Sequence, residues 1–495
     1  MTVKFKIRIF SILSIVLFCI SMTPKILQND TFYMIKLGED ILKNGIDLLD
    51  HYSWVVNLNY TYPHWLYDII VFLVFKHFNF FGIYVSNIFL FIILVISIYI
   101  INLNVNKDEL LATIFSIFFI PCLVPFITAR AQVITGILFV WEIYFIEKLI
   151  SSGKKHYIII LSLISLLVAN LHATIWPFYF ILFLPYIVEH IFYKILLLKN
   201  IKHNKSFKLI IEEIKNFKKL LFSIVIGFFI GFLTPSKICF TYIFKVMLGS
   251  SQIYIEEHAP LILTDNILFL ICLIVFFLIL AFSDLKIKLR ELFMIGGLIL
   301  MSLCSLRHTF FFFTIGLIFL SRMCNRYLTL TKDNTLNILT NMFVDNKFIY
   351  TIAFILIILI SFIKFYNNYS QEYILKSDYP IDAVNYIKDN LDTDSIRLYN
   401  DYNVGSYLLF RDIPVFIDSR CDLYLKEFNG LNYSIFDDAM NIAYNYEEKF
   451  IFYDITHALV NNDSILNKLF EKDNKFNVIY NDNFFTLYEV LENEV

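Results

Sequence analysis

The sequence predicts a polytopic α-helical membrane protein with a soluble α/β domain at its C-terminus. Hydrophobic residues make up 58% of the 495 residues and charged residues 17%, and the mean hydropathy is +0.66. Apolar runs near membrane-spanning length recur along the first 365 residues, and the composition after them is that of a soluble domain. We therefore expect a multispanning domain over residues 1–365 and an extracytoplasmic α/β domain over residues 366–495.

The basic residues predict the topology. Lysine and arginine cluster at 148–155, 199–219, 286–290 and 322–347, which the positive-inside rule assigns to the cytoplasm. The basic N-terminus precedes an apolar segment without an A-x-A-like cleavage site, which indicates an uncleaved first helix with a cytoplasmic start. About eleven spans satisfy these constraints, with the N-terminus inside and the C-terminal domain outside. They are expected at 9–25, 80–103, 109–127, 131–147, 157–173, 175–197, 220–235, 266–283, 292–306, 309–321 and 349–365.

The first outer loop, residues 26–65, is the longest polar interruption before residue 199. Asp30 follows the first span, an amphipathic run occupies residues 32–43, and Asp50 and Trp65 come later in the loop. A carboxylate at the water–lipid boundary suits chemistry on a substrate whose tail stays in the bilayer. A solvated loop with an interfacial aromatic belt is the alternative.

The segment after this loop, residues 65–78, differs from the predicted spans in length and in its content of polar residues. It is short and carries Asp68, Lys76 and His77 among apolar residues. We expect it to form a juxtamembrane or re-entrant helix.

The predicted topology brings polar residues from distant parts of the chain to the outer ends of spans. Ionisable groups at membrane depth are costly and tend to line a cavity or pathway. Each alone is more simply a snorkelling or capping residue, but their convergence on one face favours a substrate site. These residues are Arg130, Gln132, Asn170, His172, Glu257, His258 and Arg307. A divalent metal at Glu256-Glu257-His258 is possible, although adjacent residues seldom all face one ion, and we assign no metal ligands.

Periodicity and turn signals predict the elements of the C-terminal domain. Strands are expected at 396–400, 414–418, 476–480 and 484–490. Helices are expected at 380–390, 424–449 and 464–472, with a further element at 404–411.

Polar clusters follow the first two of these strands. Asp401 and Asn403 follow one, and Asp418, Arg420 and Asp422 follow the other. If both loops leave the same sheet edge, Asp401 or Asp418 should approach Arg420 within salt-bridge range. These residue types suit hydroxyl-rich or phosphate-bearing ligands. The alternative is ordinary turn chemistry.

Several function classes are excluded by missing motifs. The sequence has no G-x-x-x-x-G-K-[ST], G-x-G-x-x-G, G-x-S-x-G or H-E-x-x-H. No basic module interleaved with aromatic residues appears, so no nucleic-acid partner is expected. The seven cysteines lack C-x-x-C spacing, which predicts neither a disulfide framework nor a zinc site.

Taken together, the motifs resemble those of the GT-C glycosyltransferase superfamily. The resemblance is stronger to a bacterial group of multispanning proteins with a C-terminal extracytoplasmic domain. The matching pieces, in order, are Asp30 with Gly38, Asp50-x-x-Ser53-Trp54, His64-Trp65-Leu66, Arg130-Ala131-Gln132, Asn170-Leu171-His172, Glu256–Pro260, Arg307, Asn400–Tyr407 and Phe416–Tyr424. Three departures are visible: Ala131 stands where the group has Pro, Ala173 where it has Gly, and Ser419 where it has Gly.

The resemblance implies an activity. In GT-C enzymes an acidic residue near the start of the first outer loop is essential, and Asp30 matches it. It implies sugar transfer from a polyprenyl-phosphate donor to an extracytoplasmic glycan or lipid acceptor. The other residues named above would then bind substrates. The alternative is a non-catalytic membrane scaffold or a lipid-linked glycan carrier. A carrier would need polar groups distributed through the spans, whereas here they concentrate at the outer ends.

Overall fold

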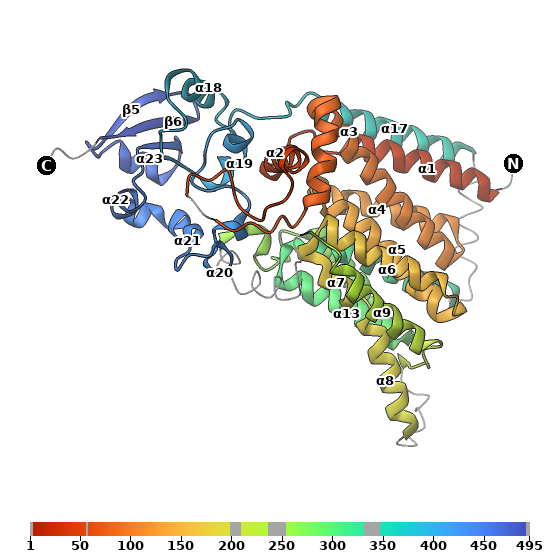
Figure 1. Ribbon diagram of the computed structural model, residues 1–495. Helices are drawn as coiled ribbons and strands as arrows, with labels where there is room; N and C mark the ends of the chain where they lie inside the picture. The colour runs from red at the N-terminus through yellow and green to blue at the C-terminus, as the bar shows by residue number, and fades with distance from the viewer. Residues whose placement is uncertain (1–2, 56–57, 199–208, 236–253, 331–346, 492–495) are drawn as a thin grey trace. The chain divides into compact units, whose positions relative to one another are not determined.

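The computed structural model describes residues 3–55, 58–198, 209–235, 254–330 and 347–491 (Figure 1). The chain divides into two compact units. The first comprises Met1–Pro24, Tyr84–Thr234 and Glu256–Ser370. The second comprises Lys25–Ile83, Pro235–Ile255 and Gln371–Val495. Most of the segment between the spans predicted at 220–235 and 266–283 lies outside the described residues.

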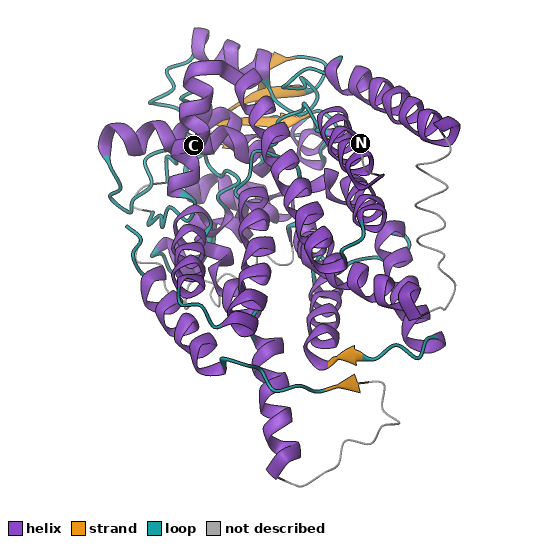
Figure 2. Ribbon diagram, turned by 90° about the vertical axis from the view of Figure 1, so that its right-hand side faces the viewer, coloured by secondary structure: helices purple, strands orange, loops and turns teal. Residues whose placement is uncertain are grey.

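The first unit is almost entirely helical (Figure 2). Each predicted span overlaps a helix, although the spans at 9–25 and 220–235 run beyond the ends of α1 and α9, and the span at 309–321 contains a π-helical turn, η5 (Phe312–Gly316). A short parallel pair, β1 (Leu209–Ile210) and β2 (Ile287–Lys288), is its sheet. The helices are α1 (Val3–Met22), the later part of α3 (Trp65–Asn106), α4 (Glu109–Leu123), η1 (Val124–Phe126), α5 (Gln132–Ser152), α6 (His156–Leu171), η2 (Ala173–Ile175), α7 (Trp176–Ile181), α8 (Leu184–Leu198), α9 (Phe217–Gly231), η3 (Glu256–His258), α12 (Ile267–Phe282), α13 (Leu289–Cys304), η4 (Leu306–His308), α14 (Thr309–Phe311), α15 (Leu317–Leu330) and α17 (Lys347–Tyr369).

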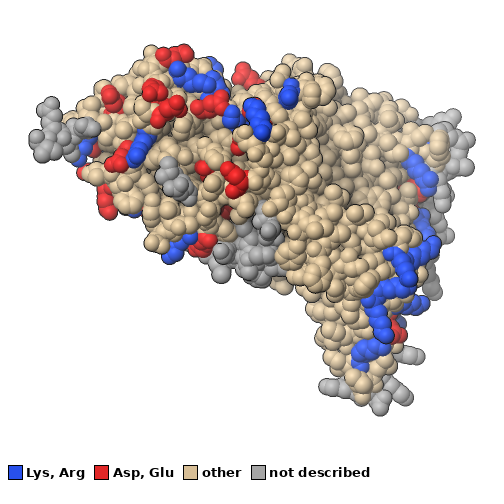
Figure 3. Space-filling view, in the orientation of Figure 1, with Lys and Arg blue, Asp and Glu red and all other residues tan. Residues whose placement is uncertain are grey.

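Apolar helices dominate this unit, as expected for a membrane protein. Five helical segments of the described chain are long and apolar enough to cross a membrane: Phe5–Met22, Trp65–Asn106, Glu109–Phe126, Ala173–Leu198 and Thr351–Tyr369. Much of the surface over these helices carries no charged side chain, and lysine and arginine gather near the ends of α8 and α9 (Figure 3).

Helix α3 is broken at Asn79, whose backbone has φ 52° and ψ −154°. A non-glycine residue with positive φ interrupts helical hydrogen bonding and kinks the helix. The break falls between the segment predicted as a juxtamembrane helix, 65–78, and the span predicted at 80–103. The first part of α3 belongs to the second unit and the later part to the first unit.

The second unit contains a four-stranded mixed sheet in the order β3-β4-β6-β5. Strands β3 and β4 are parallel, and β6 is antiparallel to both β4 and β5. The strands are β3 (Leu398–Asn400), β4 (His457–Asn461), β5 (Phe476–Asn481) and β6 (Phe485–Val490). The helices are α2 (Asn29–Asn44), the first part of α3, α18 (Ile381–Asn390), α19 (Tyr402–Phe410), η6 (Cys421–Tyr424), α20 (Lys426–Asn429), α21 (Ile435–Met440), α22 (Ile442–Tyr453) and α23 (Ile465–Phe470).

Most sequence predictions for this domain are confirmed, but one is wrong and one strand was missed. The helices predicted through 424–449 are three, separated at Gly430, whose φ is 80°, and near Asn441. Strand β4 was not predicted. The segment 414–418 is no strand; it makes one isolated bridge, Ser53 to Val415.

The backbone of 414–418 bonds outside the sheet. Val415 donates its N–H to the Tyr52 carbonyl at 3.1 Å and accepts from the Trp54 N–H at 3.1 Å. The buried Asn400 amide accepts from the Phe416 N–H at 2.9 Å and donates to the Ile417 carbonyl at 2.7 Å. These bonds satisfy groups that a strand partner would otherwise need to satisfy.

Residues 25–83 belong to the same compact unit as the C-terminal residues. Phe32 on α2 packs between Tyr379 and Tyr407, with ring centroids 5.0 and 5.2 Å away. Gly38 lets α2 cross α3 closely, because a Cβ there would lie 2.1 Å from the Asp68 carbonyl oxygen. The domains predicted at 1–365 and 366–495 therefore separate residues 25–83 from the C-terminal residues, whereas the structure packs these two segments in one unit.

Candidate active site

Polar residues at helix ends converge within the first unit. The 3₁₀ turns η3 and η4 lie together, since Leu306 donates its N–H to the Ala259 carbonyl at 2.9 Å and Ser305 Oγ donates to the Glu257 carbonyl at 3.1 Å. Arg130, which precedes α5, donates from Nη1 to Glu257 Oε1 at 2.6 Å. Residues more than 120 positions apart in the sequence therefore meet at one cluster.

Electrostatics connect Arg307 and two histidines to this pair. Burial raises the pKa of Glu257, but the charges of Arg130 and Arg307 outweigh it and bring that pKa below its ordinary value. Burial and the charge of Arg307 lower the pKa of His258 to about 4. Burial also lowers the pKa of His308. At neutral pH the cluster thus holds two guanidinium groups, one carboxylate and two neutral imidazoles.

The other polar residues predicted for this unit lie near the ends of α5 and α6. His172 Nδ1 is 3.3 Å from Thr135 Oγ1 on the first turns of α5. The amide of Asn170 donates to the carbonyls of Leu166 at 2.8 Å and Leu233 at 3.1 Å, which joins α6 to the end of α9. Gln132 is buried, and its Nε2 has no hydrogen-bond partner among the described residues. A buried donor of this kind is a candidate for contact with a ligand or ordered water.

Asp30 lies in the second unit, in the first turn of α2. The carboxylate is half-buried, and the helix dipole favours a negative charge at this position. The start of α2 is held by Asn29 Nδ2, which donates to the Tyr402 carbonyl at 3.1 Å, and by Leu27, whose N–H donates to the Tyr373 carbonyl at 2.9 Å. Trp65 begins α3 and is half-buried.

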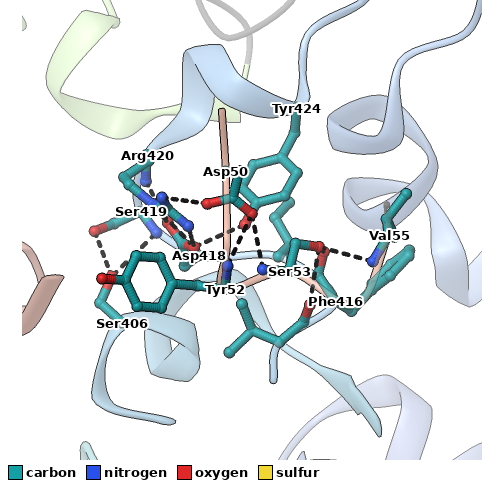
Figure 4. A network of polar contacts seen from close by, with 12 residues as sticks. Asp50, Tyr52, Ser53, Val55, Ser406, Phe416, Asp418, Ser419, Arg420 and Tyr424 are labelled. Atoms are coloured by element: carbon teal, nitrogen blue, oxygen red, sulfur yellow. Dashed lines mark hydrogen bonds and ion pairs between the residues drawn. The ribbon is translucent and has the colours of Figure 1, made fainter. Parts of the chain in front are cut away.

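Arg420 is the centre of a buried ion network in the second unit (Figure 4). Its Nε and Nη2 donate to both carboxylate oxygens of Asp418, at 2.9 and 2.6 Å, and its Nη1 donates to Asp50 Oδ1 at 2.6 Å. The predicted approach of Asp418 to Arg420 is confirmed. The three side chains are at most 1% exposed.

Tyrosines complete the surroundings of Arg420. Tyr424 donates its hydroxyl to Asp418 at 2.7 Å. The guanidinium lies 5.0 Å from the ring centroid of Tyr60 and 5.4 Å from that of Tyr52, within cation–π range. The roles of Tyr52 and Tyr60 were missed, because no spacing rule links loop tyrosines to an arginine 360 positions away.

The Asp50-x-x-Ser53-Trp54 motif holds the outer loop to the C-terminal residues. Asp50 binds Arg420, and Ser53 Oγ donates to the Val415 carbonyl at 3.0 Å. Trp54 Nε1 donates to the Leu398 carbonyl at 3.0 Å, and its ring stacks on Phe416 at 5.3 Å. Each polar residue of the motif thus has a structural partner. A ligand-binding role for Asp50, Asp418 and Arg420 remains a prediction.

The remaining predicted residues of this unit lie around α19 and η6. Asp401 is half-buried and accepts from the Tyr399 hydroxyl at 3.1 Å; burial raises the pKa of its carboxyl. Asn403 is exposed on the first turn of α19, and Asp422 is half-buried in η6.

The alternative of a metal at Glu256-Glu257-His258 does not fit the cluster. In the part of the chain that the structure describes, no group of three or more His, Cys, Asp or Glu side chains is placed to hold a metal ion. The carboxylate of Glu257 is already paired with Arg130, and Arg307 adds a second positive charge.

The chain has the fold of an archaeal oligosaccharyltransferase. The crystal structure of the Archaeoglobus fulgidus oligosaccharyltransferase in the apo form matches 92% of this chain and 69% of its own, with a TM-score of 0.58 and 11% sequence identity. A structure of oligosaccharyltransferase AglB from Archaeoglobus fulgidus, in complex with an inhibitory peptide and a dolichol-phosphate, matches over the same fractions with a TM-score of 0.57 and 10% identity.

The fold expected from the sequence motifs therefore agrees with the fold that this chain shares with the two structures. No protein-family model matches the sequence, and no curated protein matches it. At 10–11% identity the likeness describes the fold, and activity has to be argued from residues.

The lowered pKa of His258 predicts acid sensitivity. The unfolded chain binds a proton at this imidazole near pH 6.5, whereas the folded chain binds it near pH 4. Between these values the unfolded state holds more protons, so stability should fall as the pH is lowered from about 6.5 to about 4. His258→Gln should flatten this slope in thermal unfolding of the detergent-purified chain. The control is His156→Gln, at the exposed start of α6, which should keep the wild-type slope. Identical slopes for wild type and His258→Gln would contradict the assignment.

Proposed function

We propose that this chain is a membrane glycosyltransferase that transfers a sugar from a polyprenyl-phosphate-linked donor to an extracytoplasmic glycan or lipid acceptor. The observation that carries the proposal is the cluster of Arg130, Glu257, His258 and Arg307. It holds two guanidinium groups, and guanidinium binds phosphate through paired hydrogen bonds. The shared fold supports the same function, since the fold of this chain is also that of an enzyme observed with a dolichol-phosphate.

In the proposed reaction Asp30 acts as the general base. An acceptor hydroxyl oxygen attacks the anomeric carbon of the donor sugar, and its proton passes to the Asp30 carboxylate. The bond from the anomeric carbon to the phosphate oxygen breaks, and the lipid phosphate leaves with the bonding electrons. Arg130 and Arg307 are proposed to stabilise the negative charge on this leaving group.

We assign the remaining polar residues to substrate binding. The unpartnered Nε2 of buried Gln132 is the best-supported contact in the first unit, with Asn170 and His172 beside the same helix ends. In the second unit we assign the exposed Asn403 to substrate binding, together with the half-buried Trp65, Asp401 and Asp422.

A strain lacking the gene tests the function directly. It should accumulate a lipid-linked sugar and lose one surface glycan or glycolipid, and the wild-type chain should restore both. Restoration by Arg307→Gln at wild-type level would contradict a role in binding phosphate. A profile unchanged by the deletion would point to a scaffold, and a lipid-linked sugar trapped on the cytoplasmic side would point to a carrier.

We also propose the topology of about eleven spans, with the N-terminus in the cytoplasm and the C-terminal domain outside. The basic residues near the ends of α8 and α9 support it through the positive-inside rule (Figure 3). In a variant without native cysteines, Ser152→Cys should react with an impermeant maleimide only after the cytoplasm is opened. Asp463→Cys should react in intact cells whose outer envelope, if any, is permeable. Both residues are exposed, so labelling of both from outside would overturn the topology.

A further inference from the structure

A pocket of about 500 Å³ lies in the second unit between α2, the first part of α3 and the end of α19. Its volume is within the range of about 300–1,000 Å³ that is usual for small-ligand sites. The charged or amide residues of its wall are Lys36, Glu39, Lys43, Lys76, Asn79 and Asp412. The apolar residues are Ile35, Leu42, Phe72, Phe75 and Phe410. None of them belongs to the proposed reaction.

The charges of the pocket leave one lysine available. Lys36 pairs with Asp412, and Lys43 pairs with Glu39 at 2.6 Å. The exposed Lys76 forms no ion pair among the described residues; its Nζ lies 5.9 Å from the ring centroid of Phe72. Three lysines outnumber two carboxylates, so the pocket favours a ligand with a single negative charge.

The kink at Asn79 contributes to the pocket wall. The helical face that carries Phe72, Phe75 and Lys76 continues one turn later to Asn79, where the helix breaks. The amide of Asn79 therefore comes to the same wall as the ammonium group of Lys76. An ammonium and an amide are both donors that a phosphate oxygen accepts from.

The opposite face of the same helical segment carries exposed apolar side chains beside the exposed His77. Ile70 is 40% exposed, Leu73 41% and Phe78 65%. Such side chains on a segment that leads into a membrane-length helix are expected to contact lipid tails rather than water. The first part of α3 therefore presents the pocket wall on one face and side chains suited to lipid tails on the other.

We propose that this pocket binds the phosphate headgroup of an anionic bilayer phospholipid, whose tails extend along the apolar side chains of α2 and α3. Charge complementarity favours this occupant, because the single positive charge of Lys76 balances the single negative charge of one phosphodiester. The aromatic residues of the wall, Phe72, Phe75 and Phe410, would contact the first methylene groups of the tails. The bound lipid would brace α2, the helix that carries Asp30. The site does not depend on the proposed glycosyl transfer, because none of its residues is assigned to it.

The test is a lipid titration of the detergent-purified full chain by native mass spectrometry. Phosphatidylglycerol should bind more tightly than phosphatidylcholine. Lys76→Gln should weaken phosphatidylglycerol binding about 5-fold, the usual effect of one lysine near an anionic lipid surface, and leave phosphatidylcholine binding unchanged. Lys76→Arg should retain the preference. The matched control is Lys364→Gln, an exposed lysine of α17 in the other unit, which should bind as wild type does.

Three results would overturn the proposal. The first is equal phosphatidylglycerol binding by wild type and Lys76→Gln. The second is displacement of the lipid by millimolar inorganic phosphate, which would indicate a simple anion site. The third is preferential binding of a polyprenyl phosphate over phosphatidylglycerol with the same dependence on Lys76, which would make the pocket part of donor binding. Loss of glycosyl transfer in a strain assay would bear on the proposed function and not on this site.

Discussion

Asp30→Asn should lower glycosyl transfer about 10²–10⁴-fold, the range by which a positioned general base accelerates a reaction. The substitution keeps the size of the side chain and removes its charge and its ability to accept the proton. Asp30 sits in the first turn of α2, so its charge also favours the helix by roughly 0.3–1 kcal/mol. If this dipole interaction were its whole role, stability would fall slightly and transfer would persist.

The matched control is Asp40→Asn. Asp40 lies on the same helix, three turns later, and its carboxylate accepts from Asn44 Nδ2 at 2.5 Å. It should retain transfer at close to the wild-type rate. The measurements are surface-glycan output in the complemented deletion strain and thermal unfolding of the purified variants. Full complementation by Asp30→Asn would exclude the general-base role.

Arg420→Gln should destabilise the protein by about 3–5 kcal/mol, the usual cost of removing one partner of a buried ion pair. The substitution leaves the carboxylates of Asp50 and Asp418 buried without their counter-charge, at 1% and 0% exposure. Lysine cannot replace the paired hydrogen bonds of the guanidinium, so Arg420→Lys should also be destabilised.

The control for this experiment is Arg397→Gln. Arg397 pairs with Asp454 at 2.8 Å, but the two side chains are 49% and 77% exposed. An exposed pair contributes about 0–1 kcal/mol, so this variant should unfold close to the wild-type temperature. The measurement is the thermal unfolding midpoint of the purified full chain. If Arg420→Gln unfolded like wild type and lost glycan output, Arg420 would contact a ligand instead.

The sequence by itself determined the apolar helices of the first unit and much of the C-terminal domain, because these follow from local patterns. Apolar runs predict membrane helices wherever they are long enough, and α18, α23, β5 and β6 lie where periodicity and turn residues placed them. The break between residues 65–78 and the following span was visible as polar residues in an apolar run, and the structure locates it at Asn79.

The tertiary structure decided which distant residues meet. Asp50 and Arg420 are separated by 370 positions, and Arg130 and Glu257 by 127. No local pattern encodes such a pairing, since it depends on how packed elements bring their loops together. The failed strand at 414–418 has the same origin: its run of Val415, Phe416 and Ile417 suits a strand, but its backbone bonds to Tyr52, Trp54 and Asn400 instead of to a sheet neighbour. The outer loop therefore joins the C-terminal sheet through side chains and single bridges. Such contacts between distant segments leave no periodic pattern in the sequence, so periodicity does not predict them.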